Sequence, residues 1–207
     1  MITLYGYPRS RSLRVSWLLE EIGLDWQYQL VNLQQGEHKS HDYLQRNFEG
    51  KVPTLVDGNL TLCESSAICV YLAEKYAPHW LPHHSIEQQA RHHQWLSFII
   101  SELEQPLWSI GKHKYALPDP IRLPEMQAVA GWEFKKAVNV AEHWLPDSDY
   151  LFGNLPTLSD LLLTHTLNWA VAFEQKLPAK IDKYRRFVSQ RPAMMRALQR
   201  EQQALPR

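Results

Sequence analysis

The sequence has 207 residues, of which 44% are hydrophobic and 21% charged, and these proportions predict a soluble globular protein with one large core or two small ones. Lysine and arginine together number 22, as do aspartate and glutamate, so the net charge gives no reason to expect a nucleic-acid or membrane partner. The longest apolar runs are far too short to span a bilayer, and the start lacks the basic and apolar stretches of a secretory signal, so we expect a cytoplasmic protein.

The first part of the chain alternates between predicted strands and helices. Residues 2–5 and 26–32 have the composition of strands, and residues 12–22 between them carry apolar side chains at helical spacing. Two further apolar runs flank a DGN turn at residues 57–59, which predicts a β-hairpin, and residues 65–76 predict a second helix. The predicted order is therefore βαβ followed by ββα, which is typical of a small α/β domain.

The pattern becomes helical throughout after residues 78–86, whose two prolines suit a linker. Apolar side chains between Trp95 and Ile110 recur at steps of three and four in one long helix, which we expect Pro106 to kink. Pro124 suits the first turn of another helix. The predicted architecture is an α/β domain over residues 1–77, a linker over 78–86 and an all-α, all-helical domain over 87–207.

Several kinds of binding or catalytic chemistry lack their sequence signals. The eight glycines form neither a dinucleotide fingerprint nor a phosphate-binding loop, and no serine lies in a G-x-S-x-G elbow. Neighbouring helical side chains point about 100° apart, so the pairs His83-His84 and His92-His93 do not suggest a shared metal ion. We expect His92 and His93 on a helix surface. The two cysteines match no zinc spacing, so no metal is expected.

Three short segments place hydroxyl, charged and proline residues where strands end or helices begin. A proline that begins a strand could occupy a cis peptide bond, and short hydroxyl side chains can cap the free N–H groups of a helix. In a βαβ-ββα fold the starts of both helices and the proline turn converge on one edge. Because a helix N-terminus carries partial positive charge, that edge favours carboxylates and thiolates. The segments are Pro8-Arg9-Ser10-Arg11-Ser12-Leu13-Arg14, Gly50-Lys51-Val52-Pro53-Thr54-Leu55 and Glu64-Ser65-Ser66.

In this order and spacing, the segments resemble those of the cytosolic glutathione S-transferase family, and the resemblance covers essentially the whole chain. The stretch GEHKSHDYLQRNFEGKVPTLVDGNLTLCESSAI is similar to the glutathione site of theta- and phi-like bacterial members. Residues 153–160 (GNLPTLSD) are similar to the family's helix-capping motif, and Thr157 and Asp160 there predict a capping box at the start of an apolar helix. The resemblance implies a thioredoxin-like first domain, glutathione as co-substrate and a homodimer.

Carried over by the resemblance, Ser65 gives its hydroxyl and backbone N–H to the γ-glutamyl carboxylate of glutathione, with Glu64 beside it. Val52, before a cis Pro53, pairs its main chain with the cysteinyl residue of the tripeptide. Three basic side chains, at positions 38, 39 and 51, surround the glycyl carboxylate. Taken singly, the proline reads as a rigid turn and Glu64-Ser65 as a helix cap. The residues implied to bind glutathione are Ser10, His38, Lys39, Lys51, Val52, Pro53, Glu64 and Ser65.

The catalytic residue implied by the resemblance is Ser10, whose Ser-x-x-x-Arg spacing to Arg14 is similar to that of serine-type members. Its hydroxyl donates a hydrogen bond to the glutathione sulfur and, together with the helix N-terminus, lowers the pKa of the thiol. Ser12 is the second candidate, with Ser10 then acting as the helix cap. Tyr5 is the third, because it lies near the strand position of the catalytic hydroxyl in tyrosine-type members.

These implied roles predict an enzyme, a glutathione transferase, that adds the thiol of glutathione to a small, largely hydrophobic electrophile. We expect the electrophile pocket between the two domains, lined by Tyr7, Arg9, Trp108 and Tyr115. Two alternatives stay open: a glutathione-dependent reductase of peroxides or disulfides, and a glutathione-binding or protein-interaction module without turnover. The first helix starts without a Cys-x-x-Cys pair, so disulfide reduction would need the sulfur of glutathione.

Overall fold

The computed structural model describes residues 1–82 and 85–206. Contacts within the chain form two compact units, of which the first contains Met1–Trp80 and the chain from Gln190 onward, and the second contains Leu81–Ser189. The His83-His84 pair, and with it part of the predicted linker 78–86, lies outside the described residues. The units differ from the predicted domain ranges in where the last helix belongs.

The first unit is built on a four-stranded sheet in the order β2-β1-β3-β4. β1 and β2 are parallel, whereas β3 pairs antiparallel with both β1 and β4. The parallel pair needs a helical crossover, and the antiparallel pair β3 and β4 is joined by a tight turn at Gly58, where φ is 59°. The predicted βαβ-ββα order is confirmed. The strands are β1 (Ile2–Gly6), β2 (Trp26–Leu30), β3 (Thr54–Asp57) and β4 (Leu60–Cys63).

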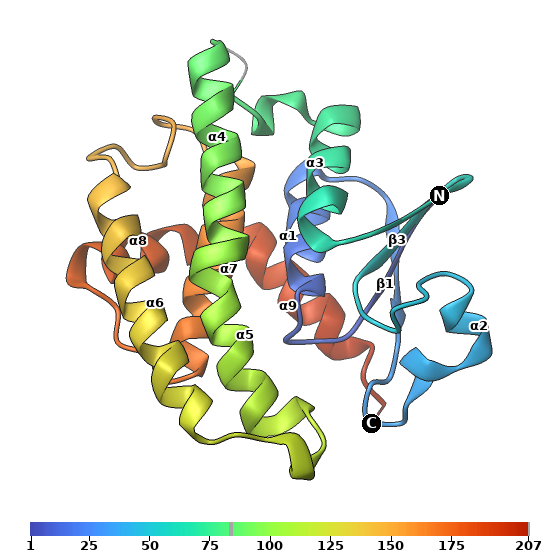
Figure 1. Ribbon diagram of the computed structural model, residues 1–207. Helices are drawn as coiled ribbons and strands as arrows, with labels where there is room; N and C mark the ends of the chain where they lie inside the picture. The colour runs from blue at the N-terminus through green and yellow to red at the C-terminus, as the bar shows by residue number, and fades with distance from the viewer. Residues whose placement is uncertain (83–84, 207) are drawn as a thin grey trace. The chain divides into compact units, whose positions relative to one another are not determined.

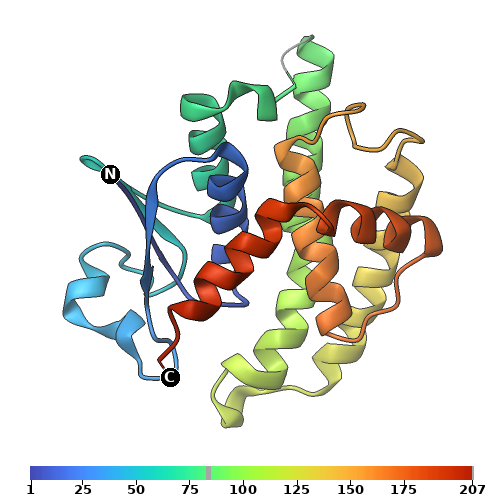
Figure 2. The same cartoon turned by 180° about the vertical axis from the view of Figure 1, so that it is seen from behind.

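Helices cover both faces of this sheet. Figures 1 and 2 show α1 (Ser12–Ile22) and α3 (Ser65–Tyr76) on one side and the short α2 (His41–Leu44) on the other. Successive side chains of a strand point to opposite faces, and along β1 the buried Ile2 and Leu4 alternate with half-buried residues. Both longer helices have the bounds that the sequence predicted, because their apolar periodicity and flanking residues are local signals.

α9 (Pro192–Gln203) packs along α1 within the first unit, although the two helices are far apart in the sequence (Figure 2). Arg191 pairs with Glu21 at 2.5 Å, and Arg196 pairs with Glu20 at 3.0 Å. The two glutamate side chains are largely buried, whereas Arg196 is half exposed, so only the acidic partners of these ion pairs are shielded from solvent. The predicted helical domain 87–207 included α9, because periodicity predicts a helix but does not indicate its packing partner.

In the second unit, the described residues form helices and no named strand. The single long helix predicted around Pro106 is interrupted, because Ile99–Glu104 is a π-helical stretch and a new α-helix starts directly before the proline. The missing proline N–H then falls in a first turn, where N–H groups lack intrahelical partners in any case. The helices are α4 (Ile86–Phe98), α5 (Gln105–Gly111), α6 (Glu125–Trp144), α7 (Leu158–Ala172) and α8 (Ala179–Ser189).

α7 begins with the predicted capping box. The backbone N–H and the hydroxyl of Thr157 donate to Asp160 Oδ2 at 2.7 and 2.6 Å. Asp160 Oδ1 accepts a hydrogen bond from the Leu151 N–H at 2.7 Å and another from the Tyr184 hydroxyl at 2.6 Å. Both oxygens of this fully buried carboxyl group therefore have donors, and the capping motif also fixes the loop before α7 and the neighbouring α8.

His92 does not lie on the helix surface, and that prediction was wrong. Its side chain is 2% exposed, and its Nδ1 lies 2.6 Å from Ser159 Oγ, which joins α4 to α7. His92 shares a helix face with the buried Trp95 and Ile99, whereas its neighbour His93 is exposed. Within the described ranges, no three His, Cys, Asp or Glu side chains are placed to hold a metal ion. None of the helices there combines the length and apolar content that a membrane span requires.

Asp57, at the end of β3, fixes the hairpin to α3. Its Oδ2 accepts from Lys75 Nζ at 2.8 Å, from Tyr76 Oη at 2.6 Å and from Tyr71 Oη at 2.7 Å. The hydrogen bond from Lys75, followed by that from Tyr76, lowers the pKa of Asp57 to about 2. The ionised carboxylate therefore stabilises the contact between the hairpin and the helix.

We expect Asp57→Asn to lower the urea concentration at the unfolding midpoint. The full decrease should be seen only at a pH above about 3.9, the pKa of an aspartate in an unfolded chain. Because the pKa of Asp57 is lowered in the folded chain, its stabilising effect is lost as the pH falls toward about 2. The gap between the midpoints of wild type and variant should shrink over that interval. Asp25→Asn changes an exposed side chain and serves as the control. A gap that stays constant with pH would contradict this account.

Candidate functional site

The turn between β1 and α1 is closed by two hydroxyl side chains. The Tyr7 backbone N–H donates to Ser12 Oγ at 3.2 Å, and the Ser12 N–H donates to Ser10 Oγ at 3.1 Å. The Ser10 hydroxyl donates to the Tyr7 carbonyl at 2.6 Å and lies 2.8 Å from Ser12 Oγ. Ser12 is fully buried, whereas Ser10 is half-buried. The two serines therefore differ in access: both organise the start of α1, and Ser10 is the more exposed.

Close packing around Gly6 holds this turn against the sheet. A Cβ atom at Gly6 would lie 2.8 Å from Ser12 Cβ and 2.9 Å from the Tyr28 ring, so only glycine fits there. Arg9, at the tip of the turn, has a φ of 63°, a backbone conformation that residues other than glycine rarely adopt. The backbone that leads to Ser10 is thus constrained at Gly6 and at Arg9.

A buried arginine connects this turn with the start of α3. Arg14 is fully buried on α1, and its Nη1 donates to Ser65 Oγ at 3.2 Å. Glu64, directly before α3, has a φ of 67° and an exposed side chain, while Ser65 is buried. Positive φ at a residue other than glycine is a strained conformation that often occurs at functional sites. Arg14 therefore links α1, the helix that follows Ser10, to the start of α3, where Glu64 and Ser65 lie.

The Val52-Pro53 peptide bond is cis, as the resemblance implied. Two residues that the sequence analysis did not single out fix the preceding carbonyl. The Lys51 carbonyl oxygen accepts from the Tyr43 hydroxyl at 2.5 Å and from Asn47 Nδ2 at 2.8 Å, and both side chains are buried. Tyr43 and Asn47 are four residues apart, a spacing that places two side chains on the same side of a helical turn, and this spacing was the signal in the sequence that could have identified them. Tyr43 and Asn47 thus hold the main chain that precedes Val52.

His38 lies against the same loop. A Cβ atom at Gly50 would come within 2.8 Å of the His38 carbonyl oxygen, so these two backbone segments are in close contact. Burial, and then the charge of Lys39, lowers the pKa of His38, which is therefore neutral at neutral pH. Lys39 is exposed, and Lys51 Nζ lies 3.0 Å from an exposed Glu49 carboxylate. Positive charge at this end of the site comes from the two lysines rather than from His38.

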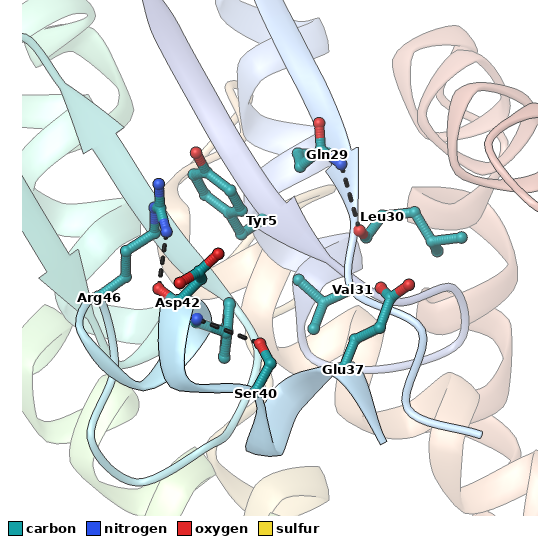
Figure 3. A pocket seen from close by; sticks show the side chains of 9 residues that line it. Tyr5, Gln29, Leu30, Val31, Glu37, Ser40, Asp42 and Arg46 are labelled. Atoms are coloured by element: carbon teal, nitrogen blue, oxygen red, sulfur yellow. Dashed lines mark hydrogen bonds between the residues drawn. The ribbon is translucent and has the colours of Figure 1, made fainter. Parts of the chain in front are cut away.

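Tyr5, the third candidate for the catalytic hydroxyl, points toward α2. Figure 3 shows its ring in a pocket that β1, β2 and α2 line, together with Asp42 and Arg46. The Arg46 guanidinium lies 5.1 Å from the ring centroid, and the Tyr43 ring lies 6.4 Å away. Because side chains alternate along β1, Tyr5 faces away from Gly6 and the Ser12 side chain that packs on it.

Trp108 and Tyr115 belong to the second unit, where Trp108 is half-buried on α5 and Tyr115 is exposed. Tyr7 and Arg9 belong to the first unit. The electrophile pocket predicted from these four residues stays a prediction.

Comparison with known proteins assigns the chain to a family. Two family models match, "Glutathione S-transferase, N-terminal domain" over residues 1–74 and "Glutathione S-transferase, C-terminal domain" over residues 123–192. Glutathione S-transferase 4 of Zea mays is 34% identical over 164 residues, which are 77% of this chain and 73% of the maize protein. The chain belongs to the glutathione S-transferase family. Glutathione S-transferase theta-2B of Homo sapiens is 33% identical over 172 residues, 75% of this chain but only 65% of the human protein, which is less than two thirds of its length.

Solved structures of other glutathione S-transferases share this fold. A glutathione S-transferase from Xylella fastidiosa aligns over 98% of this chain and 99% of its own, with a TM-score of 0.85 at 24% identity. A glutathione transferase from Phanerochaete chrysosporium, solved in complex with oxidized glutathione, aligns over 99% of this chain and 97% of its own, with a TM-score of 0.82 at 25% identity. The predicted pairing of a thioredoxin-like domain with a helical one is thus confirmed for this glutathione S-transferase.

We expect Ser12→Ala to lower the free energy of unfolding by about 1–3 kcal/mol, because the Tyr7 N–H would lose the buried hydroxyl that accepts its hydrogen bond. Urea unfolding measures this loss. Ser97→Ala, which changes an exposed serine on α4, is the matched control and should have little effect. A Ser12→Ala protein as stable as wild type would contradict the structural role of this hydroxyl.

Proposed function

We propose that this chain is a glutathione transferase that ionises the thiol of bound glutathione for attack on a small, largely apolar electrophile. The observation that carries the proposal is the half-buried Ser10 hydroxyl in the turn before α1, the helix whose buried Arg14 donates to Ser65 at the start of α3. Two helix N-termini and a buried guanidinium favour an anionic ligand. Family membership supports glutathione as that ligand, as does the oxidized glutathione in the Phanerochaete chrysosporium structure.

In this proposal, the tripeptide lies along the edge that the site residues form. Ser65 and Glu64 bind its γ-glutamyl end, and the main chain of Val52 pairs with its cysteinyl residue. The cis bond to Pro53 and the anchored Lys51 carbonyl support this pairing, because they fix the backbone before a ligand arrives. Lys39 and Lys51 attract the glycyl carboxylate, and the neutral His38 contributes a hydrogen-bonding group rather than a charge.

In this proposal Ser10 is the catalytic residue, the one whose hydroxyl contacts the sulfur of bound glutathione. Its hydroxyl, which donates to the Tyr7 carbonyl in the free protein, turns to donate to the thiolate. The greater exposure of Ser10 favours it over Ser12, whose hydroxyl is fully buried. The thiol proton leaves to solvent and the thiolate attacks the electrophilic carbon. A C–S bond forms, and in a substitution the leaving group departs with its bonding electron pair.

The remaining expectations belong to the same proposal. The electrophile pocket is formed by Tyr7, Arg9, Trp108 and Tyr115, the active form is a homodimer, and the location is cytoplasmic. Glutathione binds to the domain of residues 1–77. The helical domain of residues 87–207, which follows the linker 78–86, contributes to the electrophile pocket.

We expect Ser10→Ala to keep glutathione binding within a few-fold of wild type but to raise the pKa of the bound thiol by about one to two units, since a hydrogen bond to a charged group contributes about 1.5–3 kcal/mol. At neutral pH, kcat/KM toward an aryl halide should fall by about 10- to 100-fold. Thiolate absorbance and steady-state kinetics measure the two effects. Ser148→Ala, at an exposed serine, is the control. Wild type without glutathione binding or turnover would overturn the proposal.

A further inference from the structure

A buried carboxyl group of α9 contacts α1 beneath the turn that carries Ser10. The Glu201 side chain is 1% exposed, and its Oε1 lies 2.6 Å from Ser16 Oγ on α1. Ser16 is fully buried, and the same hydroxyl lies 3.3 Å from the Ser12 carbonyl oxygen. Pro8 and Glu201 also line a common pocket, so α9 adjoins the turn itself.

The second oxygen of this carboxyl group is unsatisfied. Glu201 Oε2 is buried and has no hydrogen-bond partner among the residues that the structure describes. Burial raises the pKa of Glu201 to about 8, and the hydrogen bond from Ser16 offsets only part of that rise. Glu201 is therefore largely a neutral acid at neutral pH.

The elements packed against α9 carry further titratable groups. β2 contributes Tyr28, whose pKa is raised by burial and then by Glu201, and whose hydroxyl lacks a partner among the described residues. The turn before α1 contributes Tyr7, which faces Tyr28, and Arg9, which lines the same pocket as Glu201. The acidic groups of α1, held by arginines of α9 and its N-terminal flank, are Glu20 and Glu21.

The charge state of Glu201 decides the direction of the Ser16 hydroxyl. The Ser16 hydroxyl donates to Glu201 Oε1 and also lies within reach of the Ser12 carbonyl, but its one proton serves only one of them fully. A neutral Glu201 carries a proton of its own and can donate to Ser16 Oγ, which leaves the Ser16 proton for the Ser12 carbonyl. When Glu201 is ionised, Ser16 has to donate to the carboxylate, and the Ser12 carbonyl loses that donor. The ionised state also buries a charge whose Oε2 has no donor, which is costly in a packed interior.

We propose that Glu201 is a positioning residue for glutathione activation: as a neutral acid it acts through Ser16 to hold the first turn of α1 in the geometry that presents Ser10, and its ionisation loosens α9 and that turn together. The proposal rests on the proposed function for its catalytic part. The docking of α9 on α1 is independent of glutathione and can be measured without it.

The experiment compares wild type, Glu201→Gln and a matched control, Glu74→Gln, which changes an exposed glutamate on α3. For each protein, kcat/KM with glutathione and an aryl halide is measured across pH and corrected for the ionisation of the bound thiol, which its absorbance reports. Amide hydrogen exchange of residues 192–203 is measured over the same range without glutathione and corrected for intrinsic exchange rates.

In wild type and in Glu74→Gln, we expect corrected kcat/KM to fall with a midpoint at about pH 8, the pKa of Glu201 in the folded chain. We expect α9 protection to fall between pH 4.5, the ordinary pKa of a glutamate, and about 8, and to level off above it, because the raised pKa stabilises the folded chain only below about 8. At a pH well above about 8, the fraction of molecules with a neutral Glu201 falls about tenfold for each pH unit. Both falls should be absent in Glu201→Gln, because the amide stays neutral and can donate to Ser16. A Glu201→Gln protein with the same alkaline fall as wild type, or one altered only in stability, overturns the proposal.

Ser16→Ala gives a second decision if Glu201→Gln does not fold. Because the hydrogen bond from Ser16 lowers the pKa of Glu201, its loss should move the pH at which the fall in α9 protection ends to a higher value, and an unchanged end point overturns the proposal. If wild type shows the protection change but neither binds nor turns over glutathione, the proposed function fails and the catalytic part of this inference fails with it. If activity is present but protection is constant with pH, the inference alone fails.

Discussion

The buried hydroxyl of Ser12 accepts a hydrogen bond from the backbone of Tyr7 and so closes the turn on which the candidate site is built. A helix start leaves several N–H groups unpaired, and a turn that leads into it from a strand has to satisfy some of them while leaving others for a ligand. Here the buried Ser12 accepts the hydrogen bond, and Gly6 has no side chain that would keep Ser12 away from the strand. Ser10 stays half-buried and therefore accessible. Removing the inner hydroxyl would therefore disturb the outer one through the backbone they share.

The positive charges near this turn lie in two separate places, and this arrangement favours a ligand with a negative group at each of its two ends. Arg14 brings a full positive charge into the interior, against Ser65 at the start of α3, and two helix N-termini add their partial charges. At the other end, the exposed Lys39 and Lys51 supply mobile charge, while burial keeps His38 neutral. A fixed, buried charge orients a ligand, whereas exposed lysines mainly attract it, because solvent screens them.

α9 makes the end of the chain part of the unit that holds the site. Its flanking and surface arginines pair with Glu20 and Glu21 at one end of α1, and Glu201 contacts Ser16 nearer the other end. The buried carboxyl of Glu201, with a pKa of about 8, changes its charge close to the neutral range. The fold thus couples an alkaline ionisation to the helix that presents Ser10.

The sequence by itself determined the features that depend on neighbours in the chain: the bounds of α1 and α3, the hairpin turn at Gly58, the capping box of Thr157 and Asp160, and the family with its cis proline. Only the tertiary structure decided which helix α9 packs against, that His92 is buried beside Ser159, and that Tyr43 and Asn47 anchor the Lys51 carbonyl. It also distinguished the environments of Ser10 and Ser12, which have the same chemistry and are two residues apart. The physical reason is that periodicity, capping and turn chemistry act within a few residues, whereas burial and hydrogen-bond partners depend on which distant segments come together.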